Sequence, residues 1–117
     1  MLKSSLKEQK QLGWSAKREL ARINYRIHTD AIKNNLIPER LTSKQVSVVY
    51  ADEADVLNVA LFGKTAKQWR DENPSLKGNM RDYASMSELI CLSNLENINS
   101  VLINEKVPQT DRIVKLN

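Results

Sequence analysis

The chain has 117 residues, a formal net charge of +4, three glycines, three prolines and one cysteine. This length fits one domain, the few glycines and prolines disfavour turn-rich β folds, and one cysteine excludes an internal disulfide framework. There is no secretory h-region and no apolar run of about 20 residues, so we expect a cytoplasmic protein that has no membrane partner. We predict an all-α fold of four to five helices, in which a long N-terminal helix packs on a compact helical array.

Residues 6–37 are predicted to form the long amphipathic helix, which Pro38 ends. Residues 38–117 are predicted to form a helical domain that packs with it, as one domain overall. Apolar side chains recur along the long helix at steps of three and four: Ala16, Leu20, Ile23, Ile27 and Ala31. These side chains could pack on the chain's own domain or pair with a second copy in a short coiled coil.

Basic side chains follow the opposite side of this helix. Residues 1–50 hold ten Lys/Arg and four Asp/Glu, so the excess of positive charge belongs to the first helix. Four cations are spaced to lie near one line: Arg18, Arg22, Arg26 and Lys33. Such a stripe is usually a solvated face; the alternative is contact with DNA phosphates. These four residues are the candidate nucleic-acid-binding site.

Capping boxes of the form Ser/Thr-x-x-Glu/Gln indicate where helices begin. The four boxes are Ser5–Glu8, Thr42–Gln45, Thr65–Gln68 and Ser85–Glu88. With the flanking periodicity, the last three predict helices over about 43–62, 66–72 and 86–104. Another helical pattern opens at Gln109 and stops at Asn117, so we expect the sequence to be part of a longer chain.

The tripeptide Gly63-Lys64-Thr65 is similar to the end of a phosphate-binding loop. That loop needs a second glycine where this chain has Asn58, and apolar packing residues lie between the two positions. We therefore interpret Gly63 as the left-handed end of one helix and Thr65 as the N-cap of the next. Trp69, in that next helix, is expected to dock it against the long helices.

Candidate catalytic and metal-binding residues are few. His28 is the only histidine, which excludes triads and two-histidine metal sites, so we expect it to be structural. Asp52, Glu53 and Asp55 form the one dense acidic cluster. Helical spacing points adjacent side chains apart, so we expect solvated acids or ion pairs with the first helix instead of a metal site. Cys91 is expected to pack. We predict no enzymatic activity, no cofactor, no metal and no small-molecule substrate.

Three strings of the sequence resemble a known family: LGWSAKRELARINYRIHTDAIKNNLIP, VVYADEADVLNVALFGKTAKQWRDENP and KGNMRDYASMSELICLSNLENINSVLI. They are similar to the region that follows the DNA-binding module in KilA-N domain proteins of bacteria and their phages. The resemblance covers roughly residues 12–117, and the KilA-N module itself would precede Met1. It implies a helical accessory domain of a phage-derived DNA-binding regulatory protein, and it carries no catalytic or ligand residue onto this chain.

Two main functions follow as hypotheses. The first is an interaction domain that supports dimerisation, or that positions a DNA-binding module, so that the partners are a second copy and DNA bound through the missing module. The second is direct nucleic-acid binding through the basic side of the first helix. A third, an enzyme built on the acidic cluster, has the least support.

Overall fold

The computed structural model describes the backbone of residues 2–117 and the side chains of residues 15, 16 and 18–117. Within this range the chain is all-α and contains no strand, as predicted. The elements are α1 (Leu2–Leu36), α2 (Ser43–Phe62), α3 (Ala66–Glu72), the 3-10 helix η1 (Met80–Tyr83), α4 (Met86–Asn104) and α5 (Gln109–Leu116). The helices predicted over 43–62, 66–72 and 86–104 are confirmed.

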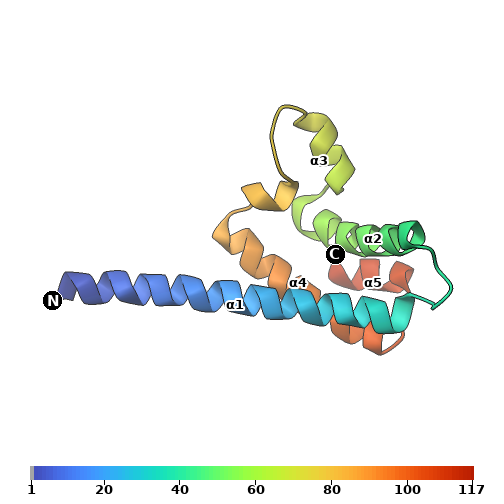
Figure 1. Ribbon diagram of the computed structural model, residues 1–117, viewed down its shortest axis with the longest axis horizontal. Coiled ribbons are helices and arrows are strands. Elements are labelled where there is room, and N and C mark those ends of the chain that lie inside the picture. The colour runs from blue at the N-terminus through green and yellow to red at the C-terminus, as the bar shows by residue number, and fades with distance from the viewer. Residues whose placement is uncertain (1) are drawn as a thin grey trace.

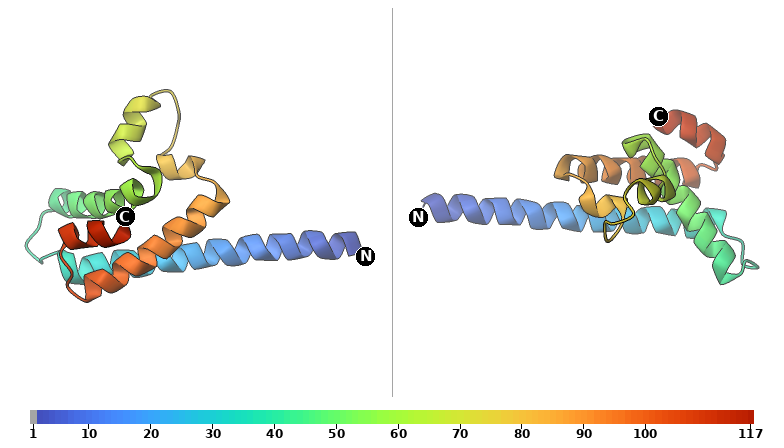
Figure 2. Two further views of the ribbon diagram at one scale, coloured as in Figure 1. Left: turned by 180° about the vertical axis from the view of Figure 1, so that it is seen from behind. Right: turned by 90° about the horizontal axis from the view of Figure 1, so that it is seen from above.

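The arrangement is a small helical body with one projecting helix (Figure 1). α4 packs along the C-terminal half of α1, α2 contacts both of them, and α5 contacts α2 and α4. The N-terminal half of α1 extends beyond the other helices in every view (Figure 2). This projection explains why the radius of gyration is 16.6 Å, when a compact domain of this length has about 13 Å.

Local sequence signals set most helix ends. At Thr42, Thr65 and Ser85 the hydroxyl accepts from the N3 amide, and the N3 side chain accepts from the N-cap amide, so three predicted capping boxes are confirmed. Gly63 ends α2 in the left-handed conformation with φ 75°. The Ser5 prediction is wrong, because α1 begins at Leu2 and Ser5 lies inside it.

Two small apolar clusters form the core. Ala31, Ile32 and Ile103 join the end of α1 to α4, and Val56, Leu57 and Leu92 join α2 to α4. The short helix α3 stands apart from both clusters.

Trp69 holds α3 differently from what the sequence suggested. Its ring lies 5.5 Å from that of Tyr83 and 4.9 Å from the Arg70 guanidinium, and α3 packs on η1. The tryptophan is buried as expected, but it docks α3 on η1 instead of on the long helices.

Candidate interaction surface on α1

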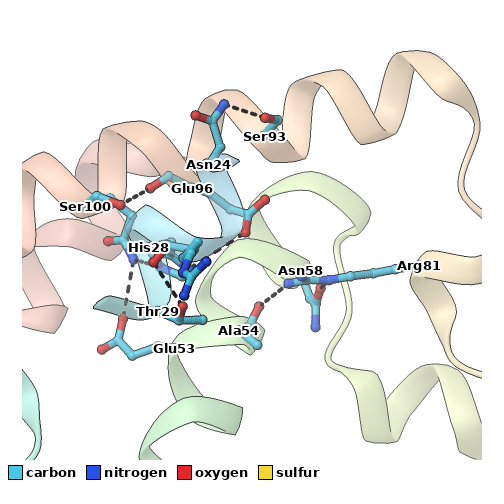
Figure 3. A network of polar contacts seen from close by, with 12 residues as sticks. Asn24, His28, Thr29, Glu53, Ala54, Asn58, Arg81, Ser93, Glu96 and Ser100 are labelled. Atoms are coloured by element: carbon cyan, nitrogen blue, oxygen red, sulfur yellow. Dashed lines mark hydrogen bonds and ion pairs between the residues drawn. The ribbon is translucent and has the colours of Figure 1, made fainter. Parts of the chain in front are cut away.

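The face of α1 that packs on α4 carries a row of polar side chains beside the apolar Ala31 and Ile32. Three side-chain hydrogen bonds join the two helices. Asn24 Nδ2 lies 2.6 Å from Ser93 Oγ, and Asn99 Nδ2 lies 2.8 Å from His28 Nε2. The third bond joins Asn35 Nδ2 to Asn104 Oδ1 at 2.9 Å. The residue numbers rise together, so the helices run in the same direction. The α1 members are four and seven residues apart, which places them on one side of the helix. Figure 3 shows Asn24 bonded to Ser93 beside His28.

A buried ion pair extends this polar contact to α2 and α5. Arg112 binds Glu53 through both ends of its guanidinium, with N–O distances of 2.6 and 2.8 Å, and the two side chains are almost fully buried. Asn99 joins the pair because its Oδ1 accepts from Arg112 Nη1 at 3.0 Å. The expectation for the acidic cluster is therefore wrong at Glu53: this carboxylate is neither solvated nor paired with α1.

The same bonds fix the tautomer of His28. Since the Asn99 oxygen accepts from Arg112, its amide nitrogen faces His28 Nε2, which must accept, and the neutral ring carries its proton on Nδ1. Burial lowers the pKa of His28 to about 4; the charge of Glu53 opposes this, while Arg81 and Arg112 add to it. The histidine is buried and structural, as predicted.

Glu96 lies on the other side of the imidazole. Its Oε2 is 4.0 Å from His28 Nδ1, too far for a hydrogen bond, and it has no hydrogen-bond partner in the part of the chain that the structure describes. Burial raises the pKa of this carboxyl to about 7, although the charge of Arg81 acts in the opposite direction.

The polar contact determines which side of α1 faces solvent. Leu20 is 58% exposed, Ile23 45% and Ile27 43%; we call these three residues the apolar stripe. Ala16 is exposed as well, and only Ala31 of the predicted series is buried. Buried donors and acceptors must meet partners, so the helix turns its polar side to α4, and the apolar stripe is left uncovered by the rest of the chain.

The α4 helix extends this apolar surface. Where α1 and α4 diverge, a crevice of about 370 Å³ is lined by Leu20 and Ala21 on one side and by Leu89 and Ile90 on the other. Ile90 is itself 39% exposed. The apolar stripe therefore continues into a groove that is wide enough to admit a side chain from a partner.

The predicted basic site lies on another part of the α1 surface. Arg18, Arg22, Arg26 and Lys33 are all exposed. Arg22 forms an ion pair with Glu19 one turn earlier, and Arg18 lines the edge of the crevice. The four cations are therefore open to solvent over about four helical turns, without forming a pocket with one another.

Other candidate sites receive little support within the described residues. No group of three or more His, Cys, Asp or Glu side chains is placed to hold a metal ion, because Asp55 instead bonds Asn58 and the Ala66 amide. No described helix is both long and apolar enough to cross a membrane. Cys91 is exposed on α4, so the expectation that it packs is wrong.

Comparison with known proteins identifies no relative: the chain matches no protein-family model, no curated protein and no solved structure. The candidate surface is therefore defined by the exposed side chains of α1 alone. An exposed apolar stripe and an exposed basic side share one projecting helix.

Proposed function

We propose that this chain is a helical interaction domain that pairs with a second copy of itself through α1, as the accessory part of a DNA-binding regulatory protein. The observation that carries the proposal is the apolar stripe: Leu20, Ile23 and Ile27 lie on one side of α1, and each is more than 40% exposed. Contiguous exposed apolar groups are typical of surfaces that bind another macromolecule.

The spacing and position of the stripe fit helix pairing. Steps of three and four residues between Leu20, Ile23 and Ile27 place them at core positions of a two-helix contact. Fully burying one such side chain contributes about 1.5–3 kcal/mol. The stripe spans eight residues, little more than one heptad, which is short for a coiled coil. The groove beside Ile90 therefore matters, because it offers further apolar area to the partner helix.

The connection to DNA rests on the resemblance to KilA-N accessory regions and on the charge of α1. A dimer of accessory domains would hold two DNA-binding modules at a fixed separation, which is how dimeric regulators match paired half-sites. In such an assembly the basic side of α1 would stay accessible near the nucleic acid.

Sedimentation equilibrium over a range of concentrations tests the self-association. The wild-type chain should show a concentration-dependent dimer, and Leu20→Glu with Ile27→Glu should shift it to monomer. Val114→Glu is the control, because Val114 is 76% exposed and lies on α5, outside the apolar stripe. Circular dichroism melts verify that each variant is folded. A wild-type chain that stays monomeric at its highest soluble concentration would refute pairing through the stripe.

A second candidate function is direct binding of nucleic acid by Arg18, Arg22, Arg26 and Lys33, which is favoured by their common exposure. Each phosphate contact on duplex DNA makes the slope of log affinity against log salt more negative by about 0.9. Changing the three arginines to glutamine should make this slope shallower by roughly three units. Arg40→Gln, in the exposed α1–α2 connection, should leave it unchanged. Absence of binding to duplex DNA at low salt would exclude this function.

A further inference from the structure

A cavity separate from the apolar stripe lies between α1, α2 and η1. Its volume is about 340 Å³, and its walls include Tyr25 and Ile32 from α1, Tyr50 from α2 and Arg81 from η1. This size is at the lower end of the range for small-molecule sites, about 300–1,000 Å³. The walls combine two phenol rings, the imidazole of His28 and an aliphatic side chain with one formal positive charge.

Arg81 is held in place by neutral acceptors. Its Nε donates to Asn58 Oδ1 at 3.0 Å and its Nη2 donates to the Ala54 carbonyl at 3.3 Å. Asn58 is oriented in turn, because its amide nitrogen donates to Asp55 Oδ1 at 3.0 Å. Figure 3 shows Arg81 reaching from η1 to these two α2 residues. The guanidinium is therefore fixed by a supporting layer of side chains, as in preorganised binding sites.

The positive charge of Arg81 has no anionic partner in contact. A guanidinium has five N–H donors, and the bonds to Asn58 and Ala54 use two of them. Among the described residues no carboxylate oxygen lies within 4.0 Å of it. Burial lowers the pKa of Arg81, and the charges of Glu96, Tyr25 and Asp55 oppose this only from a distance. A partly buried cation without a contacting anion is a costly arrangement that a bound anion would relieve.

The two tyrosines add hydrogen-bonding capacity. In the described part of the chain neither the Tyr25 nor the Tyr50 hydroxyl has a hydrogen-bond partner within the protein, whereas Thr29, also at this cavity, donates to the Arg26 carbonyl. Each phenol can therefore donate to a ligand oxygen while its ring contacts an apolar group.

We propose that this cavity binds a small organic anion, whose carboxylate or phosphate group pairs with the free N–H groups of Arg81 and whose apolar body contacts Tyr25 and Tyr50. Guanidinium donors suit both anions, because they can form two parallel hydrogen bonds to either one. The site is independent of pairing through the apolar stripe, so either proposal can fail alone.

Two-dimensional NMR of the labelled full chain tests the site, with sodium benzoate and phenyl phosphate as separate probes and sodium chloride at equal ionic strength as the reference. We expect saturable shifts of the Arg81 Nε–H and of the Tyr25 and Tyr50 signals. Arg81→Gln should abolish saturation, and Tyr50→Phe should weaken it several-fold. Arg40→Gln, at an exposed position, should change nothing. The probe that binds with the higher affinity identifies whether the site prefers a carboxylate or a phosphate group.

Tyr50→Phe keeps the test decisive if Arg81→Gln does not fold, because the Tyr50 hydroxyl has no hydrogen bond to lose among the described residues. The site is supported if either probe binds saturably to the wild-type chain and more weakly to Tyr50→Phe. The proposal is overturned if neither probe saturates, if the shifts spread over the exposed arginines of α1, or if Tyr50→Phe leaves binding unchanged.

Discussion

His28 on α1 and Glu96 on α4 are buried side by side, with Nδ1 of the imidazole 4.0 Å from Oε2 of the carboxyl and no hydrogen bond between them. Burial disfavours the charged form of both groups: the pKa of His28 falls to about 4 and that of Glu96 rises to about 7. Between these values both side chains are neutral in the folded protein. The α1–α4 contact is therefore weakened at low pH, where His28 gains a proton, and at high pH, where Glu96 loses one.

The two groups make opposing contributions to stability. The folded pKa of Glu96 is above its ordinary 4.5, so its contribution is fully present below pH 4.5 and is lost as the pH rises to about 7. The folded pKa of His28 is below its ordinary 6.5, so its contribution is present above pH 6.5 and is lost as the pH falls to about 4. Each is worth on the order of 3 kcal/mol, and between pH 4.5 and 6.5 the two slopes cancel.

Single substitutions should separate these slopes. We expect Glu96→Gln to lose stability as the pH falls from 6.5 to 4, since only the His28 contribution remains, and His28→Gln to lose stability as the pH rises from 4.5 to 7. Urea denaturation at a series of pH values measures both, and the slope is read independently of the absolute stability. Parallel pH profiles for the two variants would show that these groups do not titrate as the structure indicates.

The Glu53–Arg112 pair should be costly to break and inexpensive to replace. Arg112→Met leaves the Glu53 carboxylate buried without its cation, and we expect the free energy of unfolding to fall by about 3–5 kcal/mol. Changing Glu53 and Arg112 to methionine together removes both charges and should recover much of that loss. Urea melts of the single and double variants at pH 7 compare them. A double variant no more stable than Arg112→Met would mean that the ion pair itself contributes more than its burial costs.

Trp69 should stabilise one region of the molecule more than the rest. Its ring packs on Tyr83 and joins α3 to η1, so Trp69→Ala should cost about 3–5 kcal/mol of local stability. Amide hydrogen exchange should show faster exchange throughout α3 and η1, while the amides of α1 and α4 keep their protection. Equal loss of protection in all helices would indicate that the ring supports the whole core.

Thr65 should matter more than the lysine before it. Thr65→Ala removes the N-cap acceptor of α3 and should cost roughly 0.5–2 kcal/mol. Lys64→Ala removes only an ion pair with Glu72, whose side chains are 35% and 57% exposed, and should be nearly neutral. Thermal melts with and without ATP also test the rejected phosphate loop: stabilisation by ATP that the Lys64 variant loses would restore it.

The sequence by itself determined the helices α2, α3 and α4 and most of their ends. Thr42, Thr65 and Ser85 each meet a partner three residues away, and Gly63 needs only its own lack of a side chain to take φ 75°. Such signals act within one turn, so they can be read without knowing the fold. Pro38 acted in the same way, since the residue before a proline disfavours the helical conformation and α1 ends at Leu36.

Only the tertiary structure decided which side of α1 is buried. Periodicity groups Leu20, Ile23 and Ile27 on one side of the helix, but it leaves open whether that side packs on the chain's own domain or on a second copy. The partners of Asn24, His28 and Asn35 lie 69 to 71 residues further along the chain. The partner of Glu53 is likewise 59 residues away. Hydropathy scores each side chain alone, whereas buried polar groups are stable only when the fold brings a donor to each acceptor. That matching turned the polar side of α1 onto α4 and left its apolar stripe exposed to solvent.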